Sequence, residues 1–125
     1  MIAQNKPFEK LVFGCVADNM KLPFADNCFE AYVSNLSLMI VQHRERMIQE
    51  AFRVLKPGAR ACISTWGHEE NMSVFRIFRQ AHTNIGRQPP ANDFDRYWAL
   101  TSDLDEFRKM FVDAGFVASD IRIWH

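Results

Sequence analysis

A strand, a helix and a second strand follow one another in the middle of the chain, and this succession limits the fold more than any other feature. Residues 29–38 mix β-branched, aromatic and small side chains after a turn, which predicts a strand. Residues 42–55 carry apolar side chains at helical spacing, and Pro57-Gly58 ends that helix before an apolar strand over 59–66. Because a connection of this length joins parallel strands, we expect an α/β fold with a mainly parallel sheet flanked by helices.

Two further segments have the composition of strands. Residues 11–17 are a continuous apolar run that ends at Asp18, as expected of a strand buried on both faces. Residues 116–124 predict a last strand, in which Ile121 and Ile123 share one face because side chains alternate along a strand.

Two helices are predicted after residue 67. Residues 71–86 place apolar side chains at helical spacing, with Asn71 as the capping residue. Residues 101–115 begin with Ser102 and Asp105 at the spacing of a capping box, and a glycine ends each helix. The expected buried stripe of the second helix consists of Leu104, Phe107, Phe111 and Ala114.

The length of 125 residues suits one domain over residues 1–125. Lys and Arg total 15 and are balanced by 15 Asp and Glu, so the chain lacks the strong field that attracts nucleic acid or an anionic membrane surface. We therefore expect a small molecule or a protein as the partner, with no nucleic acid and no membrane.

The cysteines indicate a reducing compartment. Cys15, Cys28 and Cys62 are odd in number and widely spaced, which favours reduced thiols over a disulfide framework. No apolar run approaches the ~20 residues of a membrane span, and residues 1–10 lack the pattern of a signal peptide. These features predict a cytoplasmic protein.

Small and polar residues follow each of the three strands expected before residue 68. Asp18 follows the first strand, residues 34–36 end the second, and Thr65-Trp66-Gly67 follow the third. Open α/β sheets bind ligands outside the carboxyl ends of their strands, because loops and helix amino termini meet there with unpaired backbone groups. The candidate site therefore lies at this edge.

The same segments carry a family resemblance. Residues 17–24, 26–36, 53–58, 63–67 and 113–116 match, in order and at the same spacing, the Rossmann-like S-adenosylmethionine-dependent methyltransferases of class I, type-11-like. Together these segments lie along well over half of the chain. The chain thus resembles this family, which implies S-adenosylmethionine as the cofactor and a Rossmann-like sheet.

The resemblance also implies roles for single residues. Asp18 would accept a hydrogen bond from the adenine amino group, and Asn19 and Met20 would line the adenine ring. A purely structural role, in which Asp18 caps its own turn, stays open beside this one.

The other implied positions lie at the ends of the second and third strands. Ser34, Asn35 and Leu36 would lie beside the methionine part of the cofactor, mostly through backbone groups, and Trp66 would lie on the substrate side. Ordinary strand-end packing for the first three residues and core packing for Trp66 are the alternatives.

No catalytic residue is expected, because a methyl group on a sulfonium leaves behind a neutral thioether and needs little acid or base chemistry. The four histidines have no metal-ligand or triad spacing, so we expect no metal site either. They are His43, His68, His82 and His125.

The chain departs from the family at both ends. The family's first strand with its glycine-rich turn, its second strand with a ribose-binding acid, and its last strand have no counterpart, and no two glycines here have the spacing of a nucleotide-binding turn. We therefore expect a partial fold, truncated at both ends. Two absent strands would leave unpaired sheet edges, which the chain could avoid by pairing residues 11–17 with a neighbouring strand or by forming a strand-swapped homodimer.

Two functions remain open on these grounds. The first is methyl transfer to a small molecule, provided that a longer gene product or a partner chain supplies the missing half of the site. The second is a non-catalytic remnant that acts as a binding or assembly module. An unrelated α/β domain is disfavoured by the length of the ordered match.

Overall fold

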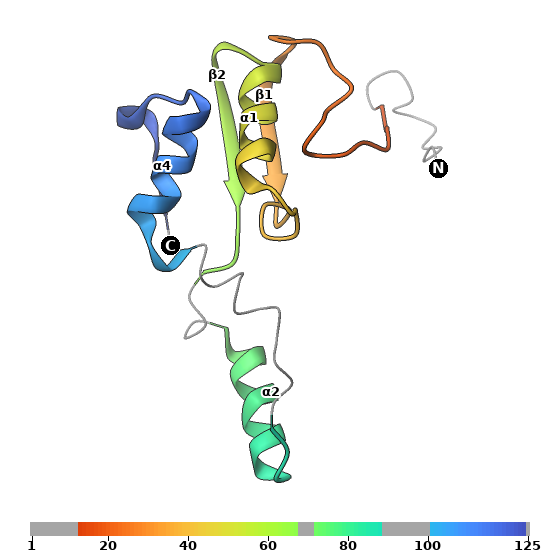
Figure 1. Ribbon diagram of the computed structural model, residues 1–125, viewed down its shortest axis with the longest axis vertical. Helices are drawn as coiled ribbons and strands as arrows, with labels where there is room; N and C mark the ends of the chain where they lie inside the picture. The colour runs from red at the N-terminus through yellow and green to blue at the C-terminus, as the bar shows by residue number, and fades with distance from the viewer. Residues whose placement is uncertain (1–12, 68–71, 89–100, 125) are drawn as a thin grey trace, which may run out of the picture.

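The computed structural model of the protein describes residues 13–67, 72–88 and 101–124 (Figure 1). Its elements are β1 (Phe29–Asn35), α1 (Arg44–Val54), β2 (Leu55–Ser64), α2 (Ser73–Asn84), α4 (Leu104–Ala114) and the 3-10 helix η2 (Ala118–Asp120).

The predicted strand, helix and strand unit is confirmed. Strands β1 and β2 pair in parallel, with Ala31 opposite Arg60 and Asn35 opposite Ser64. Figure 1 shows both arrows pointing the same way, with α1 running back beside them. Strand β2 begins directly after α1, at Leu55. The register between the two strands shifts between Phe29 and Ala31, and this irregularity accommodates the bend at Gly58, whose φ is +79°.

Helix α1 forms where the apolar stripe predicts it. Its buried residues are Met47, Ile48, Ala51 and Val54. Phe52, which the pattern placed on the same stripe, is 42% exposed and makes an edge-to-face contact with Phe116 at 5.0 Å between ring centroids.

The core lies between α1, α4 and one face of the sheet. Its buried centre consists of Leu38, Met47, Ile48 and Phe107, and Ile63 of β2 packs against it. The predicted stripe of α4 is confirmed in part, because Phe107 is buried while Leu104, Phe111 and Ala114 are half-buried.

The cap of α4 is Asp103, so the prediction of Ser102 was wrong. Asp103 has an extended backbone, and its carboxylate accepts hydrogen bonds from the amides of Asp105 and Glu106, both at 3.0 Å. The helix ends at Gly115 as predicted, with φ +115°.

The predicted strand over 11–17 was wrong for its described part. Residues 13–17 are irregular, and Val16 is 91% exposed. Residues 11 and 12 lie outside the described residues. A strand needs a neighbour for its backbone groups, and in the described part of the chain β1 and β2 pair with each other alone.

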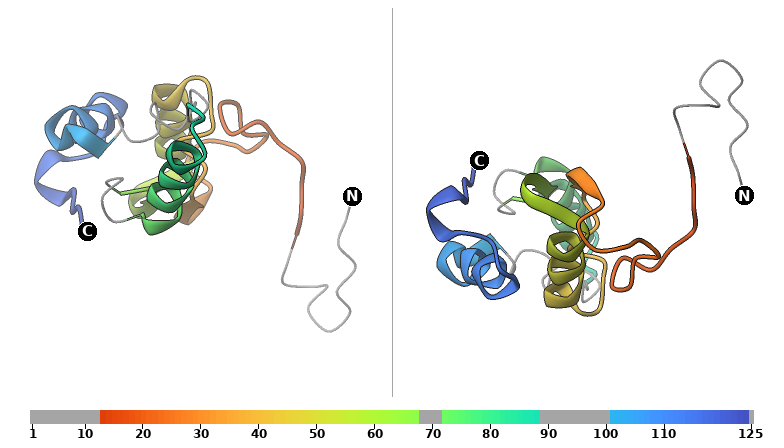
Figure 2. Two further views of the ribbon diagram at one scale, coloured as in Figure 1. Left: turned by 90° about the horizontal axis from the view of Figure 1, so that it is seen from below. Right: turned by 90° about the horizontal axis from the view of Figure 1, so that it is seen from above.

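Most of strand β1 is exposed. Val33 is 76% exposed, and only Ser34 of this strand is buried. The physical reason is coverage: α1 packs on one face of the sheet and α4 packs against α1, and the other face carries no element among the described ones. Figure 2 shows this arrangement from two ends, with the segment 13–28 leaving the sheet on one side.

The predicted strand over 116–124 is absent. Residues 118–120 form η2, and the chain then runs on without a strand partner. Arg108 of α4 donates a hydrogen bond to the carbonyl of Ile121 at 2.8 Å, while Ile123 packs against the core. The hydrogen bond from Arg108 thus holds this segment in place of strand pairing.

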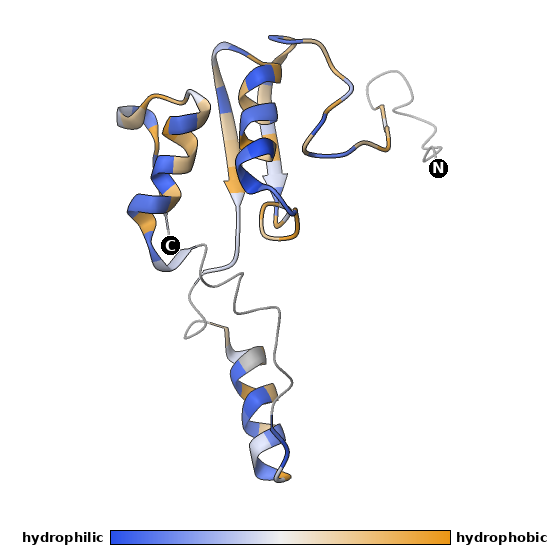
Figure 3. Ribbon diagram, in the orientation of Figure 1, coloured by the Kyte–Doolittle hydropathy of each residue, from blue (hydrophilic) through white to orange (hydrophobic). Residues whose placement is uncertain are grey.

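Helix α2 is confirmed, but the apolar side chains that the structure describes in it are exposed. Val74 is 73% and Ile77 is 67% exposed, and Figure 3 shows the hydrophobic positions along a helix that extends away from the sheet. Its capping position is Met72, and Asn71 lies outside the described residues.

We expect Gly115→Ala to destabilise the fold by ~2–4 kcal/mol, because alanine would have to adopt the left-handed backbone of this position and its Cβ would overlap Phe52. An added Cβ would lie 2.6 Å from Phe52 Cε1. Urea unfolding measures the change. Gly86→Ala is the matched control, because Gly86 also has a positive φ but an added Cβ would meet nothing within 4 Å. Equal losses in the two variants would contradict the overlap.

Candidate functional site

The carboxyl ends of β1 and β2 are joined by side-chain hydrogen bonds. Ser64 Oγ donates to Asn35 Oδ1 at 2.5 Å and accepts from the amide of Leu36 at 3.2 Å. The same amide also lies 3.1 Å from the carbonyl oxygen of Ser64. We call these three residues the strand-end interlock. It fixes the point at which the chain leaves β1.

Leu36 has φ +54°, a left-handed conformation that costs a non-glycine residue roughly 1–2 kcal/mol. The sequence predicted a strand that ends near Ser34-Asn35, and β1 does end at Asn35. Local strain of this kind persists only where surrounding bonds determine it, and here the interlock supplies them. The edge of the sheet is therefore rigidly shaped at the position expected to hold the cofactor.

Two buried hydroxyl groups lie at the same edge. Ser34 Oγ lies within reach of the Tyr32 hydroxyl, whereas Thr65 Oγ1 has no hydrogen-bond partner among the described residues. Because buried polar groups are normally paired, the Thr65 hydroxyl has capacity for one further hydrogen bond. The sequence placed Thr65 after a strand but assigned it no role.

Trp66 is half-buried and connects β2 to the start of α4 through its backbone. Its carbonyl accepts a hydrogen bond from Thr101 Oγ1 at 3.2 Å. A substrate-side role for its indole ring stays a prediction.

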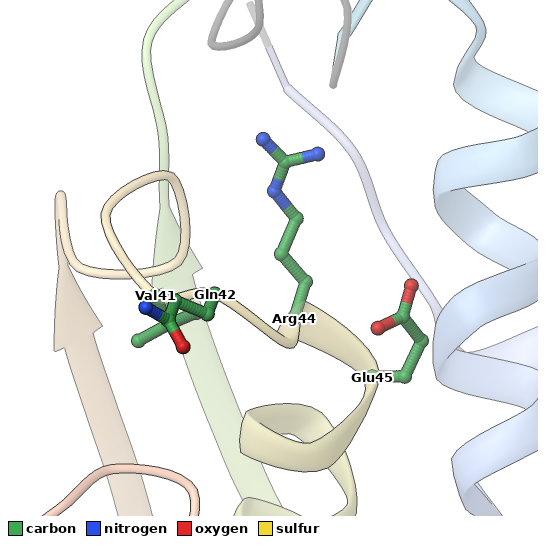
Figure 4. A pocket seen from close by; sticks show the side chains of 4 residues that line it. All are labelled: Val41, Gln42, Arg44 and Glu45. Carbon is green, nitrogen blue, oxygen red and sulfur yellow. The ribbon is translucent and has the colours of Figure 1, made fainter.

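A cavity of about 270 Å³ lies at the amino end of α1. Figure 4 shows Arg44 and Glu45 projecting from the first turn of the helix, while Val41 and Gln42 lie on the loop before it. Because α1 runs antiparallel to the strands, its amino end lies at the carboxyl edge of the sheet. The sequence did not indicate this cavity, since its shape depends on the path of the loop after Leu36.

Asp18, Asn19 and Met20 form a tight turn. Asp18 Oδ1 accepts the amide of Met20 at 2.9 Å, and the carbonyl of Asp18 accepts the amide of Lys21 at 2.9 Å. Asp18 is exposed, while Asn19 and Met20 are half-buried. Asp18 thus caps its own turn, and within the described residues the hydrogen bonds found for its side chain stay inside that turn. None of these bonds reaches the strand-end interlock.

Arg53 in the last turn of α1 binds the segment that follows this turn. Its guanidinium donates to both oxygens of Glu50, at 2.7 and 2.8 Å. It also donates to the carbonyls of Leu22 at 3.1 Å and Phe24 at 2.8 Å, and to Asp26 Oδ1 at 2.6 Å. Part of this arrangement is visible in the sequence, because Glu50 and Arg53 lie three residues apart on the polar side of α1.

The ion pairs shift the ionisation of both partners. Hydrogen bonds from Arg53 lower the pKa of Glu50 below its ordinary value; burial opposes this, and the amide of Leu22 and the charge of Arg53 add to it. Hydrogen bonds to Glu50 and then Asp26 raise the pKa of Arg53. Both groups therefore stay charged at neutral pH.

We expect Glu50→Gln to reduce the acid sensitivity of folding. Because the folded pKa of Glu50 is lowered, its contribution to stability is present above the ordinary value of 4.5 and is lost as pH falls through the folded pKa. The difference in unfolding free energy between wild type and variant should therefore narrow as pH falls from ~6 to ~3, as measured by urea unfolding. Asp113→Asn, in the exposed pair with Lys109, is the control. A constant difference across pH would contradict the assignment.

Two structural absences concern the described part of the chain. No three His, Cys, Asp or Glu side chains gather there where they could hold a metal ion. None of the helices in these ranges combines the length and the hydropathy that a membrane crossing requires.

Solved structures share the fold. A methyltransferase of Haloferax volcanii, solved with the Trm112 methyltransferase activator, superposes with a TM-score of 0.53 and 23% identity over 89% of this chain and 46% of that chain. A Bacillus halodurans protein described as a methyltransferase gives 0.52 and 22% identity, over 80% of this chain and 43% of that chain. The chain therefore carries part of the α/β methyltransferase fold.

Curated relatives carry related names. The ubiquinone/menaquinone biosynthesis C-methyltransferase UbiE of Roseobacter denitrificans is 33% identical, over 84% of this chain and 46% of that protein. The 2-phytyl-1,4-naphtoquinone methyltransferase of Nostoc punctiforme is 37% identical, over 73% and 40%. The mitochondrial 2-methoxy-6-polyprenyl-1,4-benzoquinol methylase of Xenopus laevis is 33% identical, over 79% and 35%. The chain spans less than half the length of each of these relatives.

The family match covers the beginning of the chain. Residues 1–63 match the sequence model of the methyltransferase domain, which is half of the 125 residues. This segment contains the turn at Asp18, strand β1 with the interlock residues Asn35 and Leu36, and nearly all of β2. The chain belongs to the S-adenosylmethionine-dependent methyltransferase family.

Proposed function

We propose that this chain acts, as a single domain, in methyl transfer from S-adenosylmethionine to a small molecule, and that it supplies one part of the cofactor site. The observation that carries the proposal is the strand-end interlock of Asn35, Leu36 and Ser64 at the carboxyl edge of a parallel sheet. Ligands of open α/β sheets bind at this edge.

The residues at this edge fit the methionine part of the cofactor. Its ammonium and carboxylate groups require hydrogen-bonding partners, and the hydroxyl of Thr65 has capacity to provide one. Backbone groups beside Leu36 would add to this set. On the adenine side we assign Asp18, with Asn19 and Met20 against the ring, since the Asp18 carboxylate is exposed and can accept a further hydrogen bond.

S-adenosylmethionine supplies, when bound, a methyl group activated on a sulfonium. The protein must then hold the acceptor in line with this group and exclude water. A cavity at the carboxyl edge of the sheet is placed to receive part of an acceptor, and Trp66 is assigned to the same side. The cavity is lined by Val41, Gln42, Arg44 and Glu45. None of these residues is assigned a proton transfer.

The acceptor is proposed to be of the quinone class. Support comes from the names of the relatives described above, which refer to ubiquinone or menaquinone, a naphthoquinone and a benzoquinol. Because the chain spans less than half of these proteins, the remaining part of the site is proposed to come from further sequence or a partner chain.

A non-catalytic assembly role is the second candidate. The observation that favours it is the exposed face of β1, where Val33 is 76% exposed. A homodimer that covers this face would leave the fold useful for binding even without methyl transfer.

Titration of S-adenosylmethionine into the 125-residue chain tests the first candidate. Calorimetry should detect binding, and Asp18→Ala should weaken it about tenfold or more, because one charge-assisted hydrogen bond to the adenine amino group is lost. The product of the complete reading frame is titrated in parallel.

Asp113→Ala, on the exposed surface of α4, is the control and should bind like the wild type. Undetectable binding at millimolar cofactor by both lengths of protein would rule out the proposed function. Unchanged binding by Asp18→Ala would overturn the adenine assignment alone.

A further inference from the structure

All five N–H donors of the Arg53 guanidinium have acceptors. Nε and one hydrogen of Nη2 bind the two oxygens of Glu50, and the other Nη2 donor binds the carbonyl of Leu22. The two Nη1 donors bind the carbonyl of Phe24 and Oδ1 of Asp26. A guanidinium carries five donors in a fixed planar fork, so this arrangement uses its full capacity.

Glu50 completes the arrangement from its own side. Its Oε2 accepts the amide of Leu22 at 2.7 Å, while Arg53 binds the carbonyl of the same residue. Both backbone groups of Leu22 are therefore held by one ion pair. The side chain of Glu50 is only 17% exposed, so water competes weakly for these bonds.

The segment held in this way leads directly from the turn at Asp18. Lys21, whose amide closes that turn, is bonded covalently to Leu22. Backbone bonds from Asn27 and Cys28 to the end of α1 hold the far end of the same segment, at 2.9 Å each. Across residues 18–26, the hydrogen bonds found between this segment and the rest of the described chain are those of Arg53 and Glu50.

We propose that Arg53, through Glu50, is a positioning residue that holds the Asp18–Met20 turn for the adenine end of the cofactor. The role rests on the proposed function, because it assigns the turn to the cofactor. Arg53 itself need not touch the ligand. It fixes the residue that follows the turn, and thereby the direction from which the Asp18 carboxylate is presented.

The geometry separates this ion pair from an ordinary surface pair. Lys56 and Glu30 lie 2.8 Å apart with side chains 46% and 84% exposed, and such pairs contribute little. Arg53 instead binds three backbone or side-chain points of a loop and one partner on its own helix. A lysine could keep the charge but has three donors and no fork, so Arg53→Lys should lose the positioning.

Amide hydrogen exchange of the 125-residue chain tests whether Arg53 holds the turn. In Arg53→Lys we expect exchange at Met20, Lys21 and Leu22 to become about tenfold faster or more, because the closed turn loses its anchor. Exchange at the buried α1 residues Met47 and Ile48 should stay within about twofold of wild type. Lys56→Ala is the matched control and should leave both sets unchanged.

Binding measurements on the same variants test the link to the cofactor. Arg53→Lys should raise the Kd for S-adenosylmethionine about tenfold, and in a catalytically complete protein it should raise KM for the cofactor more than it lowers kcat. Glu50→Gln should produce a smaller change in the same direction, since its side chain still accepts hydrogen bonds.

Three results would overturn the proposal. Unchanged exchange at Met20–Leu22 would show that the turn does not depend on Arg53. Faster exchange to the same extent at Met47 and Ile48 would mean that Arg53 acts on global stability. Faster exchange at the turn with unchanged cofactor affinity would remove the link to the ligand. If neither the 125-residue chain nor the product of the complete reading frame binds the cofactor, the proposed function fails together with that link, while the exchange data still decide whether Arg53 holds the turn.

Discussion

The parallel pairing of β1 with β2 is the constraint on which the rest of the structure depends. Two adjacent parallel strands require a connection that returns to the starting edge, and α1 provides it while covering one face. This return places the amino end of α1, the cavity beside Arg44 and both strand ends at one edge. The same return brings the last turn of α1, with Arg53, beside the segment that enters β1.

The sequence predicted those elements whose signals are local. The stripe of α1, the stop at Pro57-Gly58 and the end of α4 at Gly115 depend on neighbouring residues alone, and each has its predicted place within one to four residues. The prediction of strands at residues 13–17 and 116–124 was wrong because a strand depends on a partner strand. Their composition suits a sheet, but the described part of the chain offers them no neighbouring strand.

Prediction of the site shows the same division. Residues at strand ends could be located from the sequence, so Ser34, Asn35 and Leu36 were placed at the edge where they lie. The left-handed backbone of Leu36 and its hydrogen bonds to Ser64 could not be predicted. Both depend on the register between β1 and β2, and Leu36 and Ser64 lie 28 residues apart in the sequence. The hydrogen bonds from Arg53 to Leu22, Phe24 and Asp26 were not predicted for the same reason, because these acceptors lie far from Arg53 in the sequence.

The bonds among Asn35, Leu36 and Ser64 have a consequence for how this protein can change during evolution. Each of the three contributes a group that another one needs, so replacing one residue changes the effect of replacing the next. Substitutions at the ends of β1 and β2 should therefore show epistasis, and acceptable sequences there should occur as matched sets. Inherited variation at Asn35 would be tolerated only on particular backgrounds at Ser64.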